Sequence, residues 1–168
     1  IFCGQNEGPP VKMLSDPFQT NYVLQNKGFT PKREKSQERA YYLGTIYGYR
    51  RGCLVDASKK GYLGAVKYLT GVGANVHAED DYALRLASDN GQLEVVEYLV
   101  TQGADVHARD DEALRLASNG GHLEVTQYLV GVGADVHAWD DYALRWASFG
   151  GHLEVTQYLV GVGADVHA

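Results

Sequence analysis

The chain has 168 residues, of which 45% are hydrophobic and 11% aromatic, as is ordinary for a globular domain. No apolar run approaches the roughly 18 residues of a membrane span, so we expect no contact with a membrane. Two cysteines are too few for a disulfide framework and favour a reducing compartment, for which we predict the cytoplasm.

The net charge of −6 is unevenly distributed along the chain. Residues 1–50 contain seven basic and four acidic residues, a net charge of +3, and residues 51–168 contain eight basic and seventeen acidic residues, a net charge of −9. The acidic part should repel phosphate backbones, which argues against a nucleic-acid partner. The basic segment could contact an acidic partner, but a solvated and partly disordered arm is the simpler interpretation.

Residues 1–48 form a leader that does not repeat and that contains all four prolines of the chain. Within it, residues 38–46 predict a degenerate helix that covers the open end of the following array, since terminal units of repeat proteins are often atypical. The chain begins with Ile1 rather than Met and ends without a polar capping unit, so we expect a fragment of a longer array.

From residue 49 onward the sequence repeats every thirty residues. A Gly-Ala-Asp-Val tetrad, with Asn for Asp in the first copy, begins at Gly73, Gly103, Gly133 and Gly163. A fixed period in this range is typical of a solenoid, in which each unit buries its apolar face against its neighbours. The sequence therefore predicts four units, at residues 49–78, 79–108, 109–138 and 139–168.

Each unit predicts two antiparallel helices and a short extended return. In the second unit the helices are expected near residues 82–89 and 93–101, with Asp80 and Asp81 as caps of the first helix. A small residue recurs in the first helix, at Ala87 and its counterparts, and allows consecutive helices to approach closely. The predicted core positions, with their equivalents in the other units, are Leu84, Ala87, Leu93, Val96 and Leu99.

Three elements in register resemble the ankyrin repeat over residues 49–168. They are Gly-His-Leu-Glu-Val at 121–125 and 151–155, Tyr-Leu-Val at the ends of the second helices, and the Gly-Ala-Asp-Val tetrads. The resemblance implies an all-α ankyrin-repeat solenoid of helix-turn-helix units that binds another protein. The unit is shorter than the family's roughly 33 residues, because Asp-Tyr-Ala-Leu-Arg replaces the family's Gly-x-Thr-Pro-Leu-His at 81–85 and 141–145. We therefore expect stunted hairpin fingers. This short form is similar to the ankyrin arrays of giant DNA viruses of amoebae, which implies a viral protein.

Recurring histidines and aspartates could suggest metal binding or catalysis. One histidine recurs per unit, so neighbours should lie about 8–10 Å apart, too far to share a zinc ion with ligands at about 2.0–2.1 Å. We expect each imidazole to hydrogen-bond backbone between adjacent returns, and the three aspartate pairs to cap helices. The sequence thus predicts no metal site, no cofactor, no catalytic residue and no small-molecule substrate. The histidines are His77, His107, His137 and His167.

A few positions change character between otherwise similar units, and the resemblance places them on the finger tips and the concave edge of the first helices. We predict that they bind the partner, with the aromatic residues of the last unit as anchors. The alternative is that these aromatic side chains pack against a following unit, and we prefer that interpretation for Trp146. The predicted binding residues are Glu79, Tyr82, Asp89, Arg109, Glu112, Asn119, Trp139, Tyr142 and Phe149.

The sequence therefore predicts a non-enzymatic scaffold that holds a partner protein on the concave face of the repeat stack. The alternative is the substrate-recruiting arm of a larger adaptor, for example a ubiquitin-ligase adaptor, whose second domain lies outside this chain.

Overall fold

A computed structural model of the chain describes residues 54–71 and 73–167. All regular structure in this part is helical, which confirms the predicted all-α solenoid. The helices are α3 (Leu54–Lys59), α4 (Leu63–Gly71), α5 (Ala78–Asp89), α6 (Leu93–Thr101), α7 (Ala108–Asn119), α8 (Leu123–Gly131), α9 (Ala138–Phe149) and α10 (Leu153–Gly161). The predicted leader, its helix at residues 38–46 and the start of the first unit lie outside the described residues.

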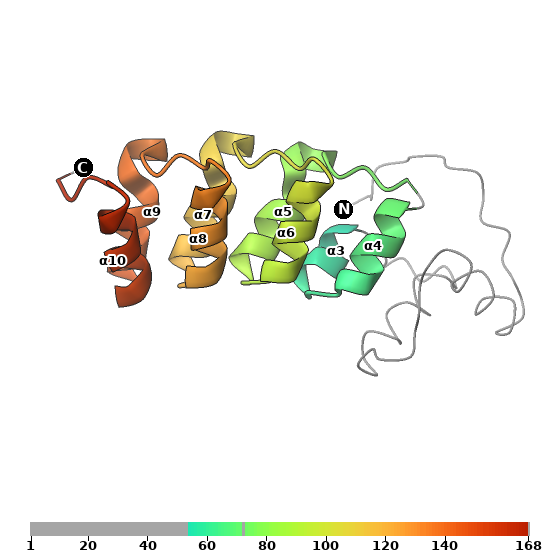
Figure 1. Cartoon of the computed structure of the whole chain (residues 1–168), viewed down its shortest axis with the longest axis horizontal. Helices are drawn as coiled ribbons and strands as arrows, with labels where there is room; N and C mark the ends of the chain where they lie inside the picture. The colour runs from blue at the N-terminus through green and yellow to red at the C-terminus, as the bar shows by residue number, and fades with distance from the viewer. Residues whose placement is uncertain (1–53, 72, 168) are drawn as a thin grey trace, which may run out of the picture.

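The helices form two parallel rows (Figure 1). The first helices of the units, α3, α5, α7 and α9, contact one another in succession, and α4, α6, α8 and α10 form the second row. The returns between units run along one edge of the stack (Figure 1). No helix in the described part is long and apolar enough to cross a membrane.

The helix boundaries agree with the sequence pattern. Helix α6 covers residues 93–101 as predicted. Helix α5 begins formally at Ala78, but residues 79–81 have left-handed backbone angles, so its regular right-handed part covers residues 82–89. The same kink recurs at the start of α7 and α9.

The core follows the prediction at all but one of its five positions. Leu84, Ala87, Val96 and Leu99 are buried, but Leu93 is only half-buried. Val95, which was not among the predicted core positions, is buried beside Val96 in the first turn of α6, because it lies one helical turn before the buried Leu99 on the same face.

The recurring alanines are completely buried. Ala87 and its counterparts have no exposed surface, and their methyl side chains allow neighbouring first helices to pack closely. The four positions are Ala57, Ala87, Ala117 and Ala147.

Candidate protein-interaction surface

The three returns that lead into a following unit in the described part each end in a left-handed turn instead of a β-hairpin finger. Glu79, Asp80 and Asp81 have φ values of 55°, 56° and 56°, and the turn recurs at residues 109–111 and 139–141. A left-handed conformation costs a residue with a side chain about 1–2 kcal/mol, so three in succession need specific support. The predicted stunting of the fingers takes this form.

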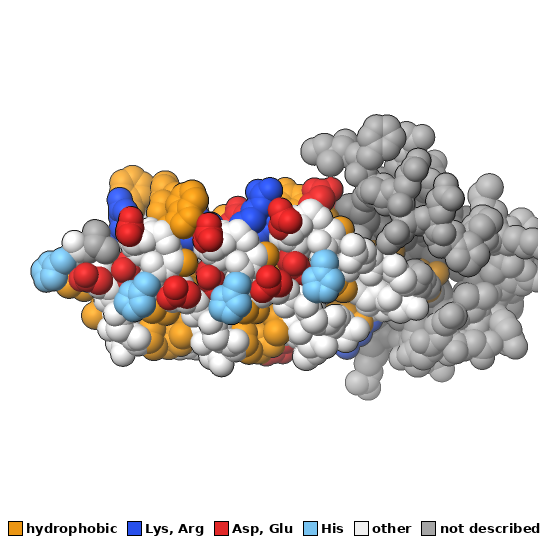
Figure 2. Space-filling model, turned by 90° about the horizontal axis from the view of Figure 1, so that it is seen from above, with side chains coloured by type: hydrophobic (Ala, Val, Ile, Leu, Met, Phe, Trp, Pro, Cys, Tyr) orange, Lys and Arg blue, Asp and Glu red, His pale blue; other side chains and the backbone are white. Residues whose placement is uncertain are grey.

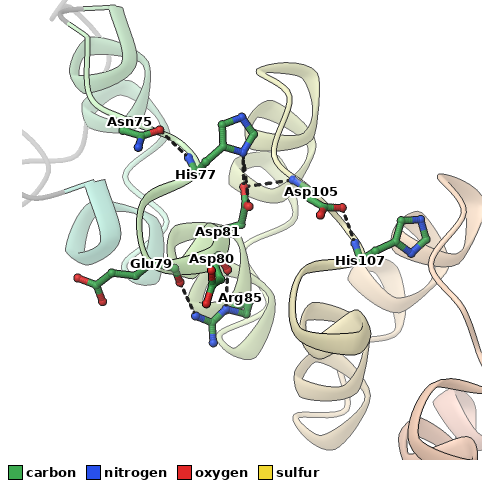
Figure 3. Close-up of polar contacts among 8 residues, drawn as sticks. All are labelled: Asn75, His77, Glu79, Asp80, Asp81, Arg85, Asp105 and His107. Carbon is green, nitrogen blue, oxygen red and sulfur yellow. Dashed lines mark hydrogen bonds and ion pairs between the residues drawn. The ribbon is translucent and has the colours of Figure 1, made fainter.

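A buried arginine in the following helix supports the turn (Figure 3). Nε of Arg85 donates to the carbonyl of Asp80 at 3.0 Å, and Nη2 donates to the carbonyl of Glu79 at 2.7 Å. Arg115 holds the next turn in the same way, at 3.1 and 2.8 Å. The carbonyl groups of the turn are thus satisfied by a side chain rather than by a strand partner.

Asp81 links two consecutive returns (Figure 3). Its buried carboxylate accepts a hydrogen bond from Nδ1 of His77 at 3.1 Å and another from the backbone N–H of Asp105 at 3.1 Å. The predicted capping role is therefore wrong for Asp81, and so is the prediction that the imidazoles bond backbone. The imidazoles of His77, His107 and His137 instead reach the next return through a carboxylate, and the pairs at 107/111 and 137/141 repeat the contact at 3.0 Å.

The resulting edge presents a row of histidine side chains with acidic side chains between them (Figure 2). No three potential metal ligands converge within the described residues. His122 and His152 belong to a different series, because Nε2 of each contacts a carbonyl of the preceding unit, Asp89 at 3.0 Å and Asn119 at 2.9 Å.

Several of the predicted binding residues also form the junctions between units. Nε of Arg109 donates to the carboxylate of Asp80 at 3.2 Å, and the indole N–H of Trp139 donates to the carboxylate of Asp110 at 3.2 Å. The variable finger-tip position therefore contacts the preceding unit in both cases. Sequence reasoning placed these residues on a surface but missed these contacts.

Equivalent arginines make different contacts at the junction of the second and third units and at the junction of the third and fourth units. Nη1 of Arg85 donates to the carboxylate of Glu112 at 2.6 Å. The guanidinium of Arg115 instead lies 4.4 Å from the ring centroid of Trp139 and 5.5 Å from that of Tyr142. An ion pair at one junction is thus replaced by a cation–π contact at the other.

The last unit carries four aromatic side chains in successive contact, which we call the aromatic band. The ring centroids of Trp139 and Tyr142 lie 5.6 Å apart, those of Tyr142 and Trp146 5.4 Å, and those of Trp146 and Phe149 5.7 Å. Hydrophobic side chains gather at this end of the stack in Figure 2. Trp146, expected in a packing role, is 36% exposed and joins the band.

Exposure differs among the predicted residues of the last unit. Phe149 is 85% exposed and Trp139 is 57% exposed, whereas Tyr142 is half-buried. In the inner unit, Asn119 and Arg109 occupy the positions of Phe149 and Trp139 and are also exposed, although a further unit follows them. These two positions therefore belong to the lateral surface of the stack. Of the remaining predicted residues, Glu79 is exposed, and Tyr82, Asp89 and Glu112 are half-buried.

Comparison with known proteins identifies the fold family. A search of curated proteins found no match to this chain. A family model for ankyrin repeats (3 copies) matches residues 45–110 and 84–168, which together make up more than half of the chain. Ankyrin repeats are generally modules for protein–protein interaction. On this match and the stacked helical pairs, the chain belongs to the ankyrin repeat family.

Proposed function

We propose that the protein is a non-enzymatic scaffold that holds a partner protein on the face lined by its first helices. The observation that carries this proposal is the exposure of Phe149 and Trp139 at lateral positions of a rigid stack. A contiguous patch of exposed aromatic side chains is unusual on a monomer without a partner, and aromatic side chains are frequent anchors of protein interfaces.

The contacts around Trp139 favour it as a pre-organised anchor. Its indole N–H is bonded to Asp110, one face of its ring lies over Arg115, and its ring contacts Tyr142 edge to face. A side chain already held in one position loses little conformational freedom when a partner binds. Phe149 lacks such a network: its ring contacts that of Trp146, and its side chain is 85% exposed.

The remaining proposed contact residues have unequal roles. Arg109 is exposed and can present its charge to a partner, although it also contacts Asp80. The carboxylate of Glu112 is already paired with Arg85, so its contribution to charge specificity acts alongside a role at the junction. We propose that Glu79, Tyr82, Asp89 and Asn119 extend the contact surface toward the start of the array.

The sharpest test uses Phe149→Ala, because truncation of a side chain this exposed removes little packing. The wild-type chain should capture a partner from amoebal lysate, the source that the viral resemblance suggests, and mass spectrometry identifies it. With the purified partner, Phe149→Ala should weaken binding by about 2 kcal/mol or more, roughly thirtyfold in Kd.

The matched control is Gln127→Ala, an exposed residue of the second row. It should change neither affinity nor melting temperature. Undiminished binding by Phe149→Ala, or a loss of binding only in step with early unfolding, would contradict the assignment of the lateral face.

A further inference from the structure

The lateral surface differs chemically between its two ends. In α9 it carries the aromatic band, in which Phe149 is 85% and Trp139 57% exposed, and hydrophobic side chains gather at this end in Figure 2. In α5 the same two positions hold the carboxylates of Asp89 and Glu79. The contrast lies in the residues of the units and not in their place along the array, because both positions are exposed in α7 as well, which has a unit on either side.

The carboxylates of Glu79 and Asp89 are available to a partner. Glu79 is exposed and Asp89 is half-buried. Side chains of the described residues bond only the backbone carbonyls of these two residues, Arg85 that of Glu79 at 2.7 Å and His122 that of Asp89 at 3.0 Å. The array therefore leaves both negative charges unpaired within its described part.

The neighbouring charges of the lateral surface are already engaged. Arg109 pairs with Asp80 at 3.2 Å, and the buried Arg85 pairs with Glu112 at 2.6 Å. The carboxylate of Asp110 accepts an indole N–H from the following unit at 3.2 Å. The middle of the surface thus offers a partner little free charge, in contrast to α5.

The aromatic end contains cations of its own. The guanidinium of Arg115 lies 4.4 Å from the ring centroid of Trp139 and 5.5 Å from that of Tyr142. The exposed Arg145 belongs to the same helix as the rings, and its charge is opposed by that of the exposed Asp140. A second cation against these rings would be repelled by Arg115, whereas an uncharged aromatic or aliphatic side chain would gain packing.

The acidic end is bounded by cations on both sides. Lys59, at the position of Asp89 one unit earlier, is exposed, and so is Arg109, at the position of Glu79 one unit later. Like charges that face each other across an interface are unfavourable. Basic side chains of a partner are therefore favoured opposite α5 and disfavoured on either side of it.

The two ends of the lateral surface lie two units apart. Neighbouring helices pack about 8–10 Å apart, so about 16–20 Å separates α5 from α9. An extended polypeptide covers this distance in about five or six residues, at roughly 3.3 Å per residue. Between the ends, Asn119 presents a neutral side chain.

We infer, resting on the proposed function, that the partner presents an extended segment with an apolar anchor at one end and basic side chains at the other. The anchor is an aromatic or aliphatic side chain that packs on Phe149 and Trp139. A pair of Lys or Arg side chains, about five or six residues from the anchor, faces Glu79 and Asp89.

The probe is a phage-displayed library of random peptides of about twelve residues, roughly twice the extended span, selected on the immobilised full chain. Enriched peptides should combine an apolar anchor with basic residues at the stated spacing. Fluorescence anisotropy of the synthesised peptides then measures Kd for the wild-type chain and its variants.

The decisive variant is Glu79→Gln with Asp89→Asn. It should weaken binding of the selected peptide about five- to thirtyfold, because two exposed charge contacts are lost, and high salt should reduce the difference. If the basic residues of the peptide are replaced by Ala, the same double variant should cost no further affinity.

The matched control is Glu97→Gln with Glu124→Gln, which removes the same charge from exposed positions of the second row. It should change Kd by less than about twofold, because these charges lie away from the peptide and are screened. Circular dichroism checks that both double variants keep the helicity of the wild-type chain.

The outcomes separate this inference from the proposed function. Peptides that are weakened by Phe149→Ala but lack basic residues, or that bind both double variants equally well, would overturn the inference and leave the proposed function standing. Peptides that bind Phe149→Ala as tightly as the wild-type chain, or a library without any enriched sequence, would contradict both.

Discussion

The glycine at the end of each first helix permits a matched test of the contact between that glycine and a side chain of the following unit. Gly121→Ala and Gly151→Ala introduce the same methyl group at the same backbone conformation, with φ of +73° and +74°. The left-handed conformation should cost both variants about 1–2 kcal/mol. Only at Gly121 must the imidazole of His152 move away, because its ring atoms would lie 2.8 Å from the new Cβ.

The additional cost at Gly121 follows from what the imidazole loses. Its hydrogen bond to the carbonyl of Asn119, at 2.9 Å, contributes about 0.5–1.5 kcal/mol net, and some packing is lost with it. We therefore expect a loss in the free energy of unfolding of about 2–4 kcal/mol for Gly121→Ala and about 1–2 kcal/mol for Gly151→Ala. Urea denaturation followed by circular dichroism measures both values.

A double-mutant cycle with His152→Ala identifies the cause. Once the imidazole is removed, Gly121→Ala should cost no more than Gly151→Ala, since only the backbone term remains. Equal losses for the two single glycine variants, or a cycle without coupling between Gly121 and His152, would refute the argument that the glycine is required by contact between units.

Three further outcomes are expected. Glu112→Gln should lower the free energy of unfolding by about 1–3 kcal/mol, because it weakens a charged hydrogen bond to the buried Arg85. Arg109→Gln breaks only an exposed ion pair and should lower it by less than about 1 kcal/mol. Equal losses in the two variants would contradict this. Burial, and secondarily Glu97, raises the pKa of the Tyr128 hydroxyl, so this residue's contribution to stability should be complete below about pH 10 and lost as the pH rises through the folded-state pKa; an alkaline loss of equal size in Tyr128→Phe would refute the assignment. A chelator should leave helicity and melting temperature unchanged, because no three potential ligands converge in the described residues, and a drop of several degrees would disprove it.

The helical pairs could be predicted because their cause is local and repeated. Gly91 ends the first helix, Ala87 permits close packing, and the apolar spacing sets the buried faces. Because these signals recur, the structure predicted for one unit applies to the others. Leu93 was misassigned because its partial burial depends on the following unit. Its counterpart Leu153, at the open end, is 65% exposed.

The site was less predictable because its contacts join residues from different units. Glu112 is paired with Arg85, 27 positions earlier, and local periodicity says nothing about such a pair. The left-handed turn was missed because three such residues in succession are unfavourable in isolation. The available signal was the arginine at residues 85, 115 and 145, five positions after an aspartate in each of the last three units. In two of these units it supplies the missing hydrogen bonds.

The different contacts of Arg85 and Arg115 across the junctions have a consequence for how such an array can evolve. The guanidinium of Arg85 pairs with the carboxylate of Glu112, and the equivalent guanidinium of Arg115 lies over the ring of Trp139, so this position of the junction accepts either kind of neighbour. If residues 109–138 and 139–168 exchanged places, Arg85 would meet the aromatic rings and Arg145 would meet the carboxylate. Recombination between near-identical units could therefore shuffle the lateral residues into new combinations while every joint kept a compatible partner.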